Sequence, residues 1–262
     1  YELWFSDGTE EGTHLVKDVY PGTSRSQIKV ITALGASAYF TAVSPSAQGR
    51  RLWKSDGTAA GTLLVPNGPS EPSGLIGWNS ALFFFAGGAL WRSDGTTLET
   101  KVVKDFSSTA SRAAVTPNPH FPVAYKGRLY FSADTDDSGR GIWSTDGTEE
   151  GTVLEAGIVP SPGAGSVDID RVAVAGDFIY FAAATEGPSS YELWRTDGTP
   201  SGTFLLKDIR PGGLSSYPYL LAPIGNSCLF TADDGEHGRE LWVSDGTPAG
   251  TLMVGDFLPG PE

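Results

Sequence analysis

The chain has 262 residues, of which 39% are apolar and 11% aromatic, so it is long enough to bury a sizeable core. A formal net charge of −13 argues against nucleic acid as a partner, because phosphate backbones are bound by Lys and Arg. No stretch reaches the roughly 18 consecutive apolar residues that a transmembrane helix needs.

The ends and the cysteine content say little about processing. The chain begins at Tyr1 without an initiator Met or a signal-like apolar segment, so we expect a mature protein or a piece of a longer one. The single cysteine, Cys228, cannot form an internal disulfide and is interpreted as a small core residue.

A repeated motif organises the chain. Six tryptophans are each followed by one residue, then Ser or Thr, then Asp-Gly-Thr, at spacings of 49, 38, 52, 51 and 48 residues. They are Trp4, Trp53, Trp91, Trp143, Trp194 and Trp242. A period near 50 residues is typical of repeat architectures such as propellers and solenoids.

Each period divides into four short predicted strands, named A to D in the order in which they complete one unit. Strand C carries the motif tryptophan. Strand D is expected at 14–18, 63–65, 101–105, 153–155, 204–208 and 252–256. Strand A is expected at 28–34, 75–78, 121–125, 171–175 and 219–224, and strand B at 39–42, 84–86, 130–133, 180–183 and 229–232.

This pattern predicts an all-β fold with one domain over residues 1–262, a β-propeller of four-stranded antiparallel blades. A β-sandwich is the alternative architecture. There are six C–D hairpins but five A–B pairs, so we expect six blade positions with one incomplete blade. Five blades plus an extra hairpin, or a piece cut from a longer array, would also fit the count.

The Asp-Gly-Thr segment between strands C and D is interpreted as a structural turn, because Asp accepts nearby backbone N–H groups and Gly tolerates positive φ. The turn residues are Asp7, Asp56, Asp94, Asp146, Asp197 and Asp245. A calcium-binding ring of these six carboxylates is the alternative, although one Asp per loop makes a poor cage for an ion that takes six to eight oxygens.

The motif tryptophans are expected to pack between neighbouring blades, and stacking on sugar rings is the functional alternative. Trp78 lies outside the motif and is the better candidate for an exposed ligand-binding aromatic. Among three histidines in distant units, His237 follows the acidic run 233–236 and is a second ligand-binding candidate.

One variable loop has the opening pattern of a calcium loop. Asp134, Asp136 and Ser138 place oxygens at alternate positions before Gly139, but Thr145 stands where a calcium loop has its Glu. We therefore name these three residues as a candidate calcium site, with an acidic solvated turn as the alternative.

The motif copies at 1–21, 191–211 and 240–259 resemble the bacterial ELWxxDGT repeat family, which recurs in secreted and surface proteins. The resemblance covers nearly the whole chain and implies an extracellular or cell-envelope setting without an established activity. Arg51, Ala89 and Gly141 replace the motif Glu in three copies, which puts any role of that Glu in doubt.

We expect function on the rim formed by the variable B–C and D–A loops. The favoured interpretation is a non-catalytic extracellular recognition or scaffold module that binds a glycan or a surface protein there. The alternatives are a multivalent lectin with one sugar site per blade, and a polysaccharide hydrolase or lyase with acids in the central channel. No catalytic motif is visible, so catalysis and the oligomeric state stay open.

Overall fold

A computed structural model describes residues 2–96, 98–106, 120–135, 139–156, 172–184, 190–257 and 259–260. Strands and turns make up the regular structure of these residues, and they contain no helix with the length and hydropathy of a bilayer-crossing segment. The all-β propeller fold expected from the sequence is confirmed, and the chain divides into two compact units.

The first unit comprises residues 1–122 together with 147–149 and begins with a two-stranded hairpin. Two four-stranded sheets follow in chain order. The strands are β1 (Leu3–Phe5), β2 (His14–Lys17), β3 (Lys29–Leu34), β4 (Ser37–Ser44), β5 (Ala47–Ser55), β6 (Leu63–Leu64), β7 (Ser73–Trp78), β8 (Ala81–Ala86), β9 (Ala89–Ser93) and β10 (Lys101–Asp105).

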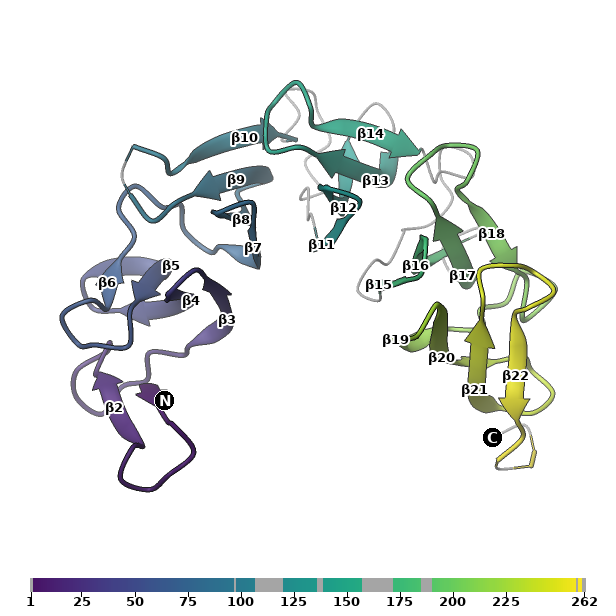
Figure 1. The fold of residues 1–262 in the computed structure, drawn as a ribbon, viewed down its shortest axis with the longest axis horizontal. Helices are drawn as coiled ribbons and strands as arrows, with labels where there is room; N and C mark the ends of the chain where they lie inside the picture. The colour runs from purple at the N-terminus through teal and green to yellow at the C-terminus, as the bar shows by residue number, and fades with distance from the viewer. Residues whose placement is uncertain are drawn as a thin grey trace. The chain divides into compact units, whose positions relative to one another are not determined.

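The second unit comprises residues 123–146 and 150–262, and three four-stranded sheets supply its strands. The strands are β11 (His120–Tyr125), β12 (Arg128–Thr135), β13 (Gly139–Thr145), β14 (Val153–Ala156), β15 (Val172–Ala175), β16 (Phe178–Ala184), β17 (Tyr191–Thr196), β18 (Phe204–Lys207), β19 (Tyr219–Ile224), β20 (Ser227–Asp233), β21 (Arg239–Ser244) and β22 (Leu252–Gly255). In every sheet each strand pairs antiparallel with the next strand of the chain (Figure 1).

The aromatic residues of strands B and C fix the register of each four-stranded sheet. In the last sheet Phe230 lies directly opposite Trp242, and their ring centroids are 6.4 Å apart in a stacked arrangement. Phe40 and Trp53 repeat this pair in the first four-stranded sheet, also at 6.4 Å. Such cross-strand aromatic pairs stabilise a sheet beyond the area they bury.

Consecutive side chains of strand C point to opposite faces of the sheet, as in any β-strand, and a β-bulge interrupts the pairing at this point. The pairing of strand C with strand D shifts between Leu241 and Trp242, and likewise between Leu193 and Trp194. A bulge changes the local twist and direction of a strand. Because side chains alternate along the strand, each sheet has a face that carries the tryptophan and a face that carries the residue before it, which we call the Trp face and the Leu face.

The Leu face of one sheet packs on the Trp face of the next sheet within each unit. Leu193 and Leu206 belong to the same buried cluster as Phe230 and Trp242. The Nζ atom of Lys207 also donates a hydrogen bond of 2.8 Å to the carbonyl oxygen of Thr251. Apolar packing and this lysine contact together hold consecutive sheets against each other.

The first tryptophan departs from the expectation that all six pack between blades. Trp4 is 61% exposed, whereas Trp53 and Trp242 are each 6% exposed. The reason is that β1 pairs only with β2, so that no strand-B phenylalanine stands opposite Trp4 among the described residues, and no sheet of the first unit precedes it. The expected shortage of one A–B pair is therefore visible as an exposed aromatic face.

Candidate functional site

The Asp-Gly-Thr loops are closed by hydrogen bonds within each loop. In the last copy Asp245 Oδ1 accepts hydrogen bonds of 2.8 Å from both the backbone N–H and the hydroxyl of Thr247. Asp7, Asp56 and Asp197 make the same two contacts, and Asp94 accepts the N–H of Thr96 at 2.8 Å. The hydroxyl of Thr247, followed by its N–H, lowers the pKa of Asp245 by stabilising the carboxylate.

The second glycine of the motif leaves room for the close approach of this aspartate. A Cβ atom added at Gly250 would lie 2.1 Å from Asp245 Oδ1, and one added at Gly151 would lie 2.0 Å from Asp146 Oδ1. Glu99 stands at this position in the third copy, where its N–H is 3.4 Å from Thr96 Oγ1, against 2.9 Å for Gly250 and Thr247. A side chain at this position therefore loosens the loop.

The aspartates serve separate loops rather than a common site. In the ranges that the structure describes, no group of three or more His, Cys, Asp or Glu side chains is placed to hold a metal ion. Asp136 and Ser138 of the candidate calcium site lie outside the described residues. Asp134 lies in β12, and its side chain is outside the described part as well.

Trp78 lies at the end of β7 and is half-buried. Its ring meets that of Phe83 edge to face, with centroids 5.5 Å apart. Part of the indole is thereby used in packing within the sheet.

His237 belongs to an ordered cluster of charges at the B–C loop of the last sheet. Its Nδ1 lies 2.7 Å from Asp234 Oδ2, and Arg210 Nη1 donates to Asp233 Oδ2 at 2.7 Å. The hydrogen bond with Asp234 raises the pKa of His237. Burial alone would raise the pKa of Asp234, but hydrogen bonds from the backbone and ring of His237 outweigh it and lower that pKa.

Cys228 is fully buried in β20, as its interpretation as a core residue requires. Burial raises the pKa of its thiol to about 12. The thiol is therefore protonated at neutral pH, and the reactive thiolate form is suppressed.

The motif glutamate has a role that the sequence left in doubt. Glu192 is 1% exposed, and its carboxylate accepts the backbone N–H of Ile209 at 2.9 Å and that of Ser216 at 3.0 Å. Glu2 makes the equivalent contacts with Val19 at 2.7 Å and with the N–H of Ser26 at 3.1 Å. The Glu therefore fixes the D–A loop that leads to the next sheet, and its place two residues before the Trp is the signal that could have revealed it.

Burial raises the pKa of Glu192, and the hydrogen bonds from Ser216 and Ile209 only partly offset that effect. The carboxyl group is thus held in the interior by the loop that it organises. Copies without this Glu need another anchor, and in the second copy Glu71 supplies a carboxylate to the N–H of Arg50 at 2.7 Å.

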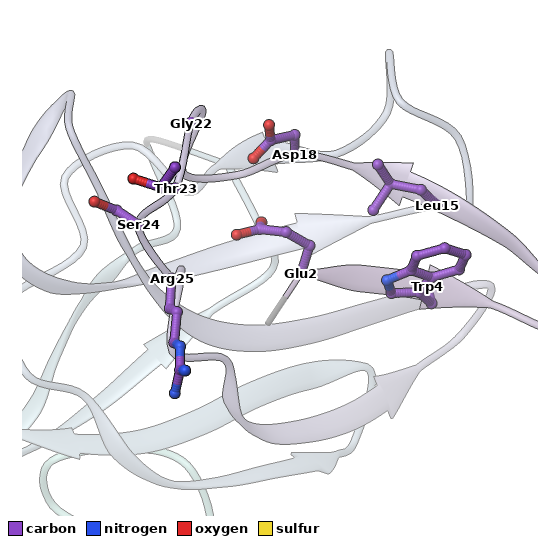
Figure 2. A pocket seen from close by; sticks show the side chains of 8 residues that line it. All are labelled: Glu2, Trp4, Leu15, Asp18, Gly22, Thr23, Ser24 and Arg25. Atoms are coloured by element: carbon purple, nitrogen blue, oxygen red, sulfur yellow. The ribbon is translucent and has the colours of Figure 1, made fainter.

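A hollow of about 410 Å³ lies against the first hairpin. Its lining residues are Glu2, Trp4, Leu15, Asp18, Gly22, Thr23, Ser24 and Arg25. Figure 2 shows Trp4 and Leu15 at one end, on β1 and β2, and Thr23, Ser24 and Arg25 on the loop at the other. The hollow combines the uncovered Trp face of the hairpin with the loop that Glu2 holds in place.

Comparison with known proteins relates the fold, but not the sequence, to other chains. No family model matches the chain, and no curated protein matches it in sequence. Among solved structures the chain is similar to a puromycin hydrolase, with 14% identity, a TM-score of 0.54, and coverage of 87% of this chain and 39% of that one.

Two further peptidase structures share the fold. A prolyl endopeptidase matches at 11% identity and a TM-score of 0.52, over 83% of this chain and 33% of that one. The β-propeller domain of the trilobed protease from Pyrococcus furiosus, described as having an open velcro topology, matches at 10% identity and a TM-score of 0.53, over 88% of this chain and 72% of that one. The chain thus spans about two fifths or less of the first two proteins.

These comparisons contradict the function expected from the sequence. The three structures described above are peptidases or a domain of one, not stand-alone glycan- or protein-recognition modules, lectins, or polysaccharide hydrolases and lyases. The expectation was wrong because the repeated motif determines turns and sheet stacking, and proteins of unrelated function share such architecture.

Proposed function

We propose that this chain is the propeller domain of a larger peptide-hydrolysing protein, in which it restricts the peptides that reach a catalytic domain carried elsewhere. The observation that carries the proposal is the fold similarity to the puromycin hydrolase, which extends over 87% of this chain but only 39% of that enzyme. A match of this extent corresponds to one domain of a longer enzyme.

The chemistry of the described residues supports a role outside the catalytic step. The thiol of Cys228 is buried and protonated. The imidazole of His237 is engaged by Asp234, and the motif carboxylate of Asp245 by Thr247. Each of these groups is used to hold the structure of a loop or a core.

The resemblance to the ELWxxDGT repeats adds an extracellular or cell-envelope location to the proposal. Fractionation of cells that produce the parent protein, followed by immunodetection, tests this part separately. Recovery of the protein in the cytosolic fraction alone would contradict it.

The peptide-restricting role is tested with the 262-residue chain and short proline-containing chromogenic peptides. In NMR spectra of the chain we expect chemical shifts that change with peptide concentration and give dissociation constants on the order of 1 mM. The chain alone should release no chromophore from the peptides. The same peptides with alanine in place of proline serve as the matched control and should bind more weakly. Turnover by the chain alone, or unchanged spectra at saturating peptide, would refute the proposal.

A further inference from the structure

The loop between β6 and β7 contains the one Asn-Gly step of the chain, Asn67-Gly68. The other asparagines are followed by serine at Asn79 and Asn226 and by proline at Asn118. The backbone nitrogen of the following residue can attack an asparagine side chain, and glycine hinders this approach least because it has no Cβ. Proline has no N–H and does not react in this way. The local sequence therefore singles out Asn67.

This step replaces a different pair of residues in the other copies of the repeat. The residue 14 positions after the motif tryptophan is Asn67 in the second copy and aspartate in four others, which are Asp18, Asp105, Asp208 and Asp256. The next residue in those four copies is Val, Phe or Ile, whereas the second copy has Gly68. The second copy thus combines a reactive amide with an unhindered neighbour at the end of strand D.

The motif glutamate that would hold the N–H of Gly68 is also missing from this copy. In three copies the glutamate accepts the N–H of the residue 17 positions further on, as Glu192 does for Ile209 at 2.9 Å. In the second copy Arg51 stands at the glutamate position, and Gly68 is 17 residues after it. Arginine has no acceptor atom in its side chain. Within the described part of the chain, no atom accepts a hydrogen bond from the Gly68 N–H.

Asn67 is exposed and lies in a turn that is tied to β5 on both sides. The N–H of Val65 donates to the carbonyl oxygen of Leu52 at 2.9 Å, and the N–H of Glu71 donates to that of Arg50 at 2.8 Å. Between these two bonds Asn67 has a φ of 55°, a left-handed conformation that asparagine adopts more readily than most residues. The side-chain amide is therefore accessible to water within a turn of fixed ends.

The Asp-Gly steps of the motif differ because both reacting groups are held there. In the last copy the hydroxyl and N–H of Thr247 bind Asp245 Oδ1 and lower the pKa of that carboxyl group. The N–H of Gly246 donates to Ser244 Oγ at 3.1 Å. An ionised carboxylate is a poor electrophile, and a hydrogen-bonded N–H is not free to attack it. The motif loops are thereby protected from the reaction that is open to Asn67.

We propose that Asn67 is a site of spontaneous deamidation, in which water is the only co-reactant. The backbone nitrogen of Gly68 attacks Cγ of Asn67 and closes a succinimide ring, while the nitrogen's proton leaves with the side-chain NH2 group as ammonia. Water then adds to one of the two ring carbonyl groups and opens the ring. Opening at one carbonyl leaves aspartate, and opening at the other leaves isoaspartate. This inference does not depend on the proposed function.

The two products have different consequences for the loop. Each adds one negative charge to a chain whose formal net charge is −13. Aspartate gives the second copy the residue that four other copies carry at this position. Isoaspartate routes the main chain through the former side chain and lengthens it between the two hydrogen bonds that tie the loop to β5. Only the isoaspartate form should therefore lower the melting temperature.

The test is incubation of the 262-residue chain at mildly alkaline pH, followed by anion-exchange chromatography and mass spectrometry of its peptides. Wild type should accumulate a more acidic species in which the peptide with Asn67 has exchanged NH2 for OH and has taken up heavy oxygen from labelled water. The peptides with Asn79 and Asn226 are internal controls and should react more slowly. Asn67→Gln should abolish the acidic species.

Two further substitutions separate the features that make this site reactive. A Cβ at Gly68 would make only ordinary contacts, 3.4 Å from Val65 O and 3.8 Å from Leu52 Cβ, so Gly68→Ala should fold normally and react more slowly. Arg51→Glu supplies the missing acceptor for the N–H of Gly68 and should also slow the reaction. Arg51→Ala supplies none and should react like wild type. Circular dichroism confirms folding of each variant.

The proposal is overturned if the peptide with Asn67 stays unmodified, or if the peptide with Asn79 or Asn226 reacts faster. It is also overturned if folded Gly68→Ala reacts at the rate of wild type. An unchanged rate in folded Arg51→Glu would refute the role assigned to the missing glutamate.

Discussion

The carboxylate of Glu192 accepts the backbone N–H of Ile209, 17 residues further along the chain, at 2.9 Å. Glu2 and Glu240 make the same connection over the same number of residues, to Val19 at 2.7 Å and to Phe257 at 3.1 Å. In these three copies a single side chain thereby fixes the start of the loop that follows strand D.

Removal of this carboxylate should destabilise the protein. Glu192→Ala leaves the buried N–H groups of Ile209 and Ser216 without their acceptor, and an unsatisfied buried donor costs about 1–3 kcal/mol. We expect a loss of about 3 kcal/mol in the free energy of unfolding measured in urea. Glu10→Ala, at an exposed loop residue, is the control and should change little. Equal stability of the two variants would refute the role assigned to Glu192.

The contribution of the second motif threonine to the free energy of unfolding should depend on how deeply that threonine is buried. Thr251 is fully buried and bonds to Ser244 Oγ and to the carbonyl oxygen of Thr247, both at 2.8 Å. Thr251→Val keeps the shape and should cost about 1–2 kcal/mol of unfolding free energy, because it removes a buried hydrogen bond to Ser244 and a partly buried one to Thr247.

Thr13→Val provides the matched comparison for Thr251. Thr13 makes the same contacts to Ser6 and Thr9 but is exposed, so water replaces the lost hydrogen bonds. In the same urea titration, Thr13→Val should lose only a fraction of the unfolding free energy that Thr251→Val loses. A larger loss at Thr13 would show that burial does not govern these loops.

The loss of stability on truncating a motif tryptophan should also depend on the sheet in which that tryptophan lies. Trp242 is 6% exposed and stacked on Phe230, so Trp242→Ala should cost about 3–5 kcal/mol. Trp4 is 61% exposed, and Trp4→Ala should cost less than about 1 kcal/mol. Chemical denaturation of both variants measures the difference, and similar losses would contradict the exposure of the first hairpin.

The pair of His237 and Asp234 should make stability depend on pH. The hydrogen bond to Asp234 raises the pKa of His237 above its ordinary 6.5, so the folded chain holds the proton more tightly than the unfolded chain. The stabilisation is complete below pH 6.5 and is lost as pH rises through the raised pKa.

The melting temperature of wild type relative to His237→Gln, followed across this pH range, measures the effect. The advantage of wild type should shrink as pH rises. Asp234→Asn should reduce the pH dependence, because it removes the largest of the interactions that raise the pKa of His237, the others being with Asp256 and Glu236. An advantage that grows with pH would reverse the sign and exclude this pair as its source.

Calcium binding by Asp134, Asp136 and Ser138 stays a prediction. A ligand bound only to the folded state stabilises it by about 2.7 kcal/mol when present at 100 times its dissociation constant. Chelation should therefore lower the melting temperature, and Asp136→Ala should make the protein insensitive to chelator. An unchanged melting temperature of wild type after chelation would refute the site.

Much of the fold was determined by the sequence itself. The spacing of six tryptophans, the Asp-Gly-Thr turns and the aromatic strand-B runs predicted the strands, their antiparallel order and the shortage of one A–B pair. These are local properties: Asp and Gly select a turn, and a β-rich run between turns selects a strand.

Only the tertiary structure decided what the repeated residues do. Trp4 and Trp242 stand in the same motif, yet one is exposed and the other buried, because burial depends on neighbouring sheets rather than on the motif. The Glu192 contact joins backbone groups 17 and 24 residues away; the repeated position of this Glu two residues before the Trp marks it in the sequence, but only the folded chain identifies its partners. Exposure and long-range hydrogen bonding are properties of the packed chain, so they could be recognised only once the sheets were stacked.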